Sequence, residues 1–149
     1  MSLKAFEDLM LGVSKKLNIS LSPDKSLGCQ IYGKDFLIVY GFNRDPEGMY
    51  IYCYVGKPSI EQECELLKEL LQMNLLTFGD NTPSFGYDSD NDCLMLTLRM
   101  GLPTATIEKV INALLTISGY VNSLSEKYII TNKLMIGDEI EEPPLVVNI

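Results

Sequence analysis

The chain has 149 residues, 46% of them hydrophobic, and it carries a formal net charge of −8 with no histidine. A chain of this length and composition buries a core as one domain without a metal ion or disulfides to hold it together. The acidic charge and the absence of a Lys/Arg cluster argue against a nucleic-acid partner, and the lack of histidine excludes His-based acid/base catalysis and Ser-His or Cys-His nucleophile pairs.

The first predicted element is an amphipathic helix that ends at Asn18, before the turn-forming stretch Ser22-Pro23-Asp24. Its apolar residues recur at helical spacing and predict a surface helix with one buried stripe: Leu3, Phe6, Leu9, Met10, Val13 and Leu17. The N-terminus lacks the uninterrupted apolar segment and the small-residue cleavage site of a secretory signal. Because no apolar run approaches the length of a membrane span, we expect a cytoplasmic protein.

Three strands are predicted next, at Cys29–Tyr32, Asp35–Phe42 and Met49–Val55. The first two are joined by the two-residue turn Gly33-Lys34, with glycine at its first central position. The third follows the loop 43–48, which consists of turn-forming residues throughout. Such short connections predict an antiparallel meander.

The third strand carries apolar side chains on both of its faces. Tyr50, Tyr52 and Tyr54 point one way, and the other face holds Met49, Ile51, Cys53 and Val55. A sheet with one solvated face normally alternates apolar with polar residues, so the tyrosines indicate a surface that contacts something else. The alternative, which the sequence leaves equally open, is a partly exposed amphipathic face without a partner.

A second helix is predicted at Ser59–Asn74, with Ser59 as the N-cap and Gln62 completing a capping box. Its apolar residues span a wider arc than one core contact requires: Cys64, Leu66, Leu67, Leu70, Leu71 and Met73. We expect Leu67 and Leu71 to face the sheet, and Leu66, Leu70 and Met73 to face elsewhere. A helix with two apolar faces indicates a subunit interface; the alternative is a wide core stripe in a monomer.

The rest of the chain predicts a short strand at Ser84–Tyr87, a strong strand at Cys93–Met100 and a helix that begins at Pro103-Thr104. In the strong strand four side chains share one face: Leu94, Leu96, Leu98 and Met100. We expect residues 1–130 to form a single domain. Residues 131–149 are predicted to be an acidic, mobile tail, because charge, proline and terminal position favour disorder.

The sequence predicts no catalytic residue, cofactor or metal ion. Asp88-Ser89-Asp90-Asn91-Asp92 resembles the start of a calcium loop, but Cys93 and Arg99 replace the glycine and the glutamate that such a loop needs. A solvated hairpin turn explains these aspartates. The four cysteines are too scattered for a zinc site, and each is expected to be a buried, reduced thiol: Cys29, Cys53, Cys64 and Cys93.

The predicted order of helix, three strands, helix, two strands and helix, in a small acidic chain, resembles the type III secretion chaperones of the Tir-chaperone (CesT) family. Three stretches carry the resemblance: the leucine-rich Leu70–Leu75, which contains Asn-Leu; Pro83–Asp88, which contains Pro-Ser-aromatic-Gly; and the apolar strand Cys93–Leu98. The resemblance extends to about Ser123. It implies an α+β fold, in which helices pack on a twisted antiparallel sheet, and a homodimer without ATPase activity.

The resemblance also implies a function and two surfaces. The protein would bind the N-terminal chaperone-binding segment of a secreted effector in extended form, in the bacterial cytoplasm, and keep it export-competent. The implied dimer interface consists of Leu66, Leu70, Met73, Phe85 and Tyr87, and the implied effector-binding residues are Phe6, Met10, Ile31, Tyr50, Tyr52 and Tyr54. Two alternatives remain: an acidic interaction or inhibitor module that binds a folded target, and a carboxylate enzyme with a bound metal ion, which the missing histidines and the failed calcium loop disfavour.

Overall fold

The computed structural model describes residues 2–22, 26–31, 33–77 and 81–131, so the predicted tail lies outside the described residues apart from Thr131. In chain order the elements are α1 (Ser2–Leu17), β1 (Leu27–Ile31), β2 (Lys34–Tyr40), β3 (Gly48–Pro58), α2 (Ile60–Leu76), β4 (Pro83–Asp88), β5 (Cys93–Gly101), α3 (Ile107–Lys127) and β6 (Ile130–Thr131), with short 3-10 helices at Phe42–Arg44 and Leu102–Thr104. The predicted order of the longer elements is confirmed, and β6 is an addition.

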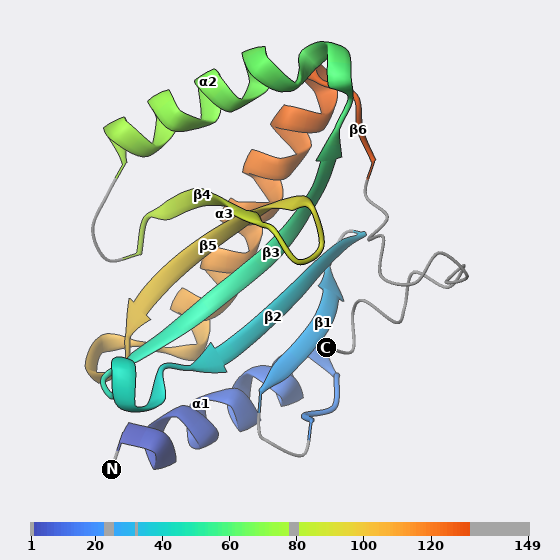
Figure 1. The fold of residues 1–149 in the computed structure, drawn as a ribbon. Helices are drawn as coiled ribbons and strands as arrows, with labels where there is room; N and C mark the ends of the chain where they lie inside the picture. Colours follow the sequence, from blue (N-terminus) through green and yellow to red (C-terminus); the bar gives the residue numbers. More distant parts are fainter. Residues whose placement is uncertain (1, 23–25, 32, 78–80, 132–149) are drawn as a thin grey trace.

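The five longer strands form one antiparallel sheet in the order β1-β2-β3-β5-β4, and β6 pairs with the end of β3. Strands β1 to β3 form the predicted meander. Lys34 already belongs to β2 and pairs with Ile31, so Gly33, with a φ of 76°, takes the second central position of the turn rather than the first. Figure 1 shows α3 running along one face of the sheet and α2 lying beside the edge strand β4. The predicted α+β architecture is therefore confirmed.

The core lies between one face of the sheet and the helices α1 and α3. Alternate residues of β3 and β5 point into it and are fully buried: Met49, Ile51, Cys53, Val55, Leu94, Leu96, Leu98 and Met100. From α3 they meet Val110, Leu114 and Ile117. The period-2 alternation of β3 is thus as predicted, because its three tyrosines point to the opposite face and stay half-buried.

The last described residues close over the start of α2. Strand β6 pairs with Lys57 and Pro58 of β3, the Ser59 N–H donates to the Ile129 carbonyl at 3.1 Å, and the Ile129 N–H donates to Oε1 of Gln62 at 2.8 Å. Ser59 is the N-cap residue as predicted, but its side chain caps no backbone N–H. The predicted capping box is wrong: Oε1 of Gln62 accepts from the Ile129 N–H and, at 3.3 Å, from the Ser59 hydroxyl, but not from the Ser59 N–H, which bonds to Ile129.

The start of α3 also differs from the prediction. The helix begins at Ile107, because the preceding Leu102–Thr104 forms a separate 3-10 helix that contains the proline. Thr106 is the N-cap, and its Oγ1 accepts a hydrogen bond from the Lys109 N–H at 3.1 Å. This bond satisfies one of the backbone donors that the first turn of a helix leaves unpaired.

Candidate interaction surfaces

A cluster of large apolar side chains is exposed on α2 and on the neighbouring strand β4. We call it the α2–β4 surface, and its members are Leu67, Leu71, Leu75 and Tyr87. A groove between the helix and the strand adjoins it, with Leu70 and Phe85 in its lining. Single exposed apolar side chains are ordinary on soluble proteins, whereas a cluster of this kind marks an interaction site.

The orientation predicted for α2 is wrong. Leu66 and Leu70 are 0% and 3% exposed and pack in the core, whereas Leu67 and Leu71 are 37% and 68% exposed. Both pairs have the spacing of one helical face, and the two faces are about 100° apart, so periodicity alone cannot choose between them. Of the residues predicted for the dimer interface, Leu66 is therefore inside the core.

The other predicted interface residues lie at or near the groove. Leu70 is almost fully buried but contributes to the groove lining, Phe85 is half-buried there, and Tyr87 is exposed. Met73 is half-buried and packs against the core. Leu71 and Leu75, which the prediction did not include, are the most exposed large apolar residues of the surface. Leu76 is also exposed, but on the side of α2 that faces away from Leu67.

One polar side chain fixes the groove, and the sequence prediction missed it. The Asn74 amide makes two hydrogen bonds to Phe85: Nδ2 donates to the carbonyl at 2.9 Å, and Oδ1 accepts from the N–H at 2.8 Å. Only this orientation of the amide lets both bonds form, because the reverse would oppose donor to donor. The hydroxyl of Thr77 donates to the Met73 carbonyl at 2.9 Å, which fixes the end of the helix.

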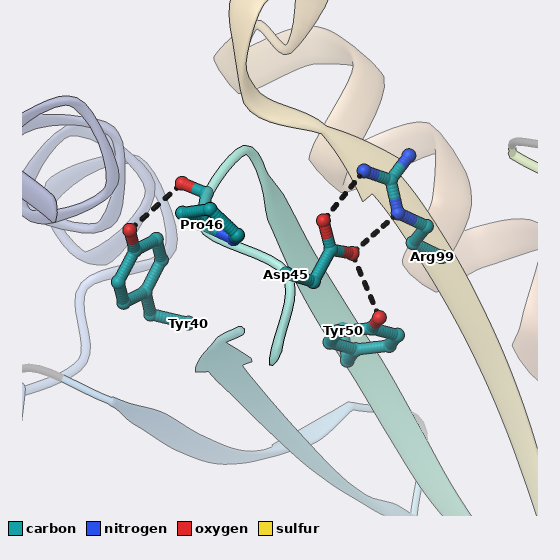
Figure 2. A network of polar contacts seen from close by, with 5 residues as sticks. All are labelled: Tyr40, Asp45, Pro46, Tyr50 and Arg99. Carbon is teal, nitrogen blue, oxygen red and sulfur yellow. Dashed lines mark hydrogen bonds and ion pairs between the residues drawn. The ribbon is translucent and has the colours of Figure 1, made fainter. Parts of the chain in front are cut away.

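The face of the sheet that points away from the core carries Tyr50, Tyr52 and Tyr54, and we call it the tyrosine face. An ion pair lies at one end of this face. Asp45 accepts from Arg99 Nε at 2.6 Å and Nη2 at 2.9 Å, and the Tyr50 hydroxyl donates to the same carboxylate at 2.7 Å (Figure 2). The hydrogen bond from Arg99, followed by that from Tyr50, lowers the pKa of Asp45 to about 2. Tyr40 adds a bond from its hydroxyl to the Pro46 carbonyl at 2.7 Å. The loop before β3 is thus held in place.

The tyrosine face continues across three strands. The Tyr50 and Tyr52 rings stack with their centroids 6.3 Å apart. In the register of the sheet these residues lie opposite Val39 and Leu37 of β2, which are half-buried as well. Tyr54 packs at the far end, in a small apolar cluster with Cys93 and Met95: a separate patch from the main core. The face is therefore apolar over most of its length but carries no large, fully exposed side chain on β3.

Phe6 and Met10, predicted to contact an effector, are buried in the core at 1% and 0% exposure. The Phe6 ring lies 5.7 Å from that of Tyr40, which covers it from the sheet. Their placement on a surface patch is therefore wrong; they form the buried stripe that the periodicity of the first helix predicts. The large apolar residues exposed on α1 are Leu3 and Leu11. Ile31 is half-buried at the end of β1.

The main-chain groups of β1 that face away from β2 can be identified from the alternation of the ladder. The Gly41 N–H donates to the Gly48 carbonyl at 3.0 Å, one step beyond the paired ends of β2 and β3. Because bonded and non-bonded pairs alternate in an antiparallel ladder, odd-numbered residues of β2 bond to β3 and even-numbered ones bond to β1. The register of β1 then leaves Gly28 and Gln30 with their N–H and C=O groups directed outward.

The aspartate-rich loop forms the predicted hairpin turn between β4 and β5. The carboxylate of Asp88 accepts from the Asp90 N–H at 3.0 Å and from Nδ2 of Asn91 at 2.7 Å. Asp92 pairs with Lys57 at 2.6 Å and accepts a hydrogen bond from the Tyr87 hydroxyl. Local partners thus account for these carboxylates, and across the described residues no group of three or more Cys, Asp or Glu side chains is arranged to hold a metal ion.

Three of the four cysteines are buried as predicted, and the prediction is wrong for Cys64, which is exposed on α2. Burial raises the pKa of Cys29 and Cys93 to about 11 and that of Cys53 to about 12. The buried thiols therefore stay protonated at neutral pH and have little nucleophilic character. None of the helices in the described part of the chain has the length and apolar character needed to cross a membrane.

Comparison with known proteins adds a family and a fold. The model of the Tir chaperone protein (CesT) family matches residues 9–118. A comparison with curated proteins finds no match. Among solved structures, the fold is similar to that of the type III secretion chaperone SycH of Yersinia pestis in complex with a stable fragment of YscM2, at a TM-score of 0.65 and 13% identity, covering 80% of this chain and 98% of that one.

Two further structures give the same result. The HopA1-SchA chaperone-effector complex matches with a TM-score of 0.62 and 15% identity, covering 80% of this chain and 91% of that chain. The ExoT-SpcS complex from Pseudomonas aeruginosa matches with a TM-score of 0.57 and 11% identity, covering 83% and 97%. At these identities the likeness concerns the fold alone.

Proposed function

Because the chain belongs to the Tir chaperone protein (CesT) family, we propose that it is a homodimeric type III secretion chaperone. It binds the N-terminal segment of a secreted effector in extended form in the bacterial cytoplasm, and it performs no catalysis. The observation that carries this proposal is the α2–β4 surface, where large apolar side chains lie exposed side by side on one helix and its neighbouring strand, as on a surface that another molecule covers.

The α2–β4 surface is the proposed contact between two copies. Its core is Leu67 and Leu71 on the outward face of α2, with Tyr87 on β4 and Leu70 beneath them in the groove. Burying a large apolar side chain stabilises an interface by about 1.5–3 kcal/mol before the losses of association are subtracted. In a twofold arrangement the same patch faces its copy, so each of these residues contributes twice to the contact.

The proposed effector site lies at β1, the edge strand of the sheet opposite β4. The outward N–H and C=O groups of Gly28 and Gln30 on β1 offer the hydrogen bonds that an added strand requires. Alternate side chains of such a strand then point toward α1 and toward the tyrosine face. Ordering an extended segment has an entropic cost, and two sites on one dimer offset it because they raise the effective concentration of the second contact.

The experiment is co-purification of the protein from its native host, followed by limited proteolysis of the complex. The proposal predicts that a segment near the N-terminus of one secreted protein resists the protease, and that the same segment is cut once the chaperone is removed. A folded domain that is equally resistant with and without this chain would instead identify an inhibitor module and overturn the proposal.

A further inference from the structure

The two outer strands of the sheet, β1 and β4, differ in how their free edges are treated. An unpaired edge is a template on which another chain can add a strand, and proteins protect it in various ways. We propose that Asn74 closes the β4 edge, so that a second copy packs on the α2–β4 surface through side chains only and strand addition takes place at β1. The closure is a property of the free protein; only its consequence for an effector rests on the proposed function.

The two hydrogen bonds of Asn74 occupy the position of a missing strand. The register pairs Phe85 with Leu96 across β4 and β5. The N–H and C=O of Phe85 both bond to the Asn74 side chain, at 2.8 and 2.9 Å, so they point away from β5. A neighbouring strand makes the same two bonds to an outward-facing residue. The primary amide of asparagine supplies one donor and one acceptor at the spacing of a peptide group.

The next outward position of β4 is closed as well. Alternation places Pro83, Phe85 and Tyr87 outward. Pro83 has no N–H to donate, and its carbonyl lies 3.3 Å from the Thr77 hydroxyl, whose one proton it shares with the closer Met73 carbonyl. Of the outward positions of this short strand, only Tyr87 keeps its main chain clear of these contacts. Two adjacent outward residues are needed to fix the register of an added strand, and β4 does not provide them.

Strand β1 is built in the opposite way. Its outward residues, Gly28 and Gln30, are adjacent outward positions, neither is proline, and the register directs the main-chain groups of both away from β2. No strand pairs with this edge among the described residues. The closed edge therefore borders the exposed leucines of α2, where a copy would otherwise pair incorrectly, and the open edge lies at the far side of the sheet.

Hydrogen exchange of the free protein tests the first step. The Phe85 amide should exchange at least about tenfold more slowly than the Tyr87 amide, since a single hydrogen bond has roughly that effect. Equal rates at the two amides would overturn the closure by Asn74. This measurement needs no variant and no effector. It is made at a dilution at which light scattering shows single copies, because a second copy on the α2–β4 surface would cover Tyr87 as well, and it can therefore succeed or fail independently of the proposed chaperone function.

The variant Asn74→Ala tests the consequence. Light scattering should show assemblies larger than those of the unaltered protein, increasing with concentration, with exchange at Phe85 accelerated in the smallest species and slowed again in the assemblies. The matched control is Thr106→Ala. It also removes a hydrogen bond between a side chain and the main chain, but this bond lies at the start of α3. It should keep the mass of the unaltered protein.

An unchanged mass for Asn74→Ala at every concentration would mean that Asn74 only stabilises the groove, and this result would overturn the proposal. If Asn74→Ala does not fold, Asn74→Asp replaces it, because aspartate still accepts from the Phe85 N–H but cannot donate to the carbonyl. That variant should assemble as well, and a mass equal to that of the unaltered protein would again contradict the closure.

Discussion

Leu70 and Leu71 are adjacent in sequence, but Leu70 is 3% exposed in the core and Leu71 is 68% exposed on the surface of α2. Substitutions at the two positions should therefore have different consequences. A charge at Leu70 would have to be buried and would unfold the domain. A charge at Leu71 enters water in a single copy, so that only an interface detects it.

The first prediction concerns Leu71→Glu. This variant should have half the mass of the unaltered protein at micromolar concentration, because two carboxylates would be forced into an apolar contact. Light scattering measures the mass, and circular dichroism checks that the fold is kept. The matched control is Asn122→Glu, which adds the same charge at an exposed position of α3, away from the α2–β4 surface. A dimeric Leu71→Glu protein would exclude α2 as the interface.

The second prediction concerns the ion pair between Asp45 and Arg99. The folded-state pKa of the Asp45 carboxyl group is lowered from the usual 3.8 to about 2. A carboxyl group with a lowered pKa stabilises the fold fully above its unfolded value, and this stabilisation disappears as the pH falls toward 2. The Asp45→Asn variant should therefore be less stable than the unaltered protein at pH 7. Between pH 4 and 2 its free energy of unfolding should fall less than that of the unaltered protein. Urea unfolding at a series of pH values measures both effects.

The control for that series is Asp90→Asn in the exposed hairpin, where no ion pair is removed. It should follow the acid unfolding curve of the unaltered protein. If Asp45→Asn shows the same steep loss of stability below pH 4 as the unaltered protein, the network in Figure 2 does not hold the loop before β3.

The third prediction concerns Gly56, next to the bulge in β3 at which the register with β5 shifts. Its φ is 123°, and a Cβ atom there would come within 2.2 Å of the Thr131 carbonyl oxygen. Gly56→Ala should reduce the free energy of unfolding by about 1–3 kcal/mol and detach β6. Gly119→Ala is the control, because its helical position has open space, and it should raise stability by roughly 0.5–1 kcal/mol. Equal effects of the two substitutions would contradict the docking of β6 over Gly56.

The fourth prediction tests strand addition at β1. Gln30→Pro removes the outward N–H, and an edge strand tolerates proline at such a position. Gln30→Ala removes the same side chain, with its bond to Asp35, but keeps the N–H. Binding of the effector segment should weaken about tenfold in the proline variant relative to the alanine variant. Equal affinities, measured by calorimetry, would place the effector elsewhere.

The fold was largely predictable from the sequence because its strands alternate strictly. In β3 the period of two assigned each side chain to the correct face, and the short connections required an antiparallel meander. Strand β6 was not predictable: two residues show no period, and their pairing with Lys57 and Pro58 depends on tertiary packing. The capping box failed for the same reason, since Ile129 competes for Gln62.

The interaction surfaces were less predictable, because an apolar stripe marks burial without saying what buries it. The helical spacing of Phe6 and Met10 would be the same whether a partner protein or the protein's own sheet covered them, and in the structure they lie in the core. On α2, both apolar faces satisfy the helical period, and only the way the helix packs beside β4 and against the core distinguishes Leu70 from Leu71. Asn74 was missed because a single asparagine near a helix end carries no signal of the Phe85 main chain that it binds.

Hydrogen exchange of the complex tests the central claim most directly. The effector's N-terminal segment is added to the protein, and exchange is followed at the main-chain amides of Gly28 and Gln30. If the chaperone binds the segment in extended form, hydrogen exchange at both amides should slow strongly. The effect should saturate at a fixed ratio of segment to dimer. Binding that leaves both amides unchanged, or that requires a folded effector domain, would contradict it.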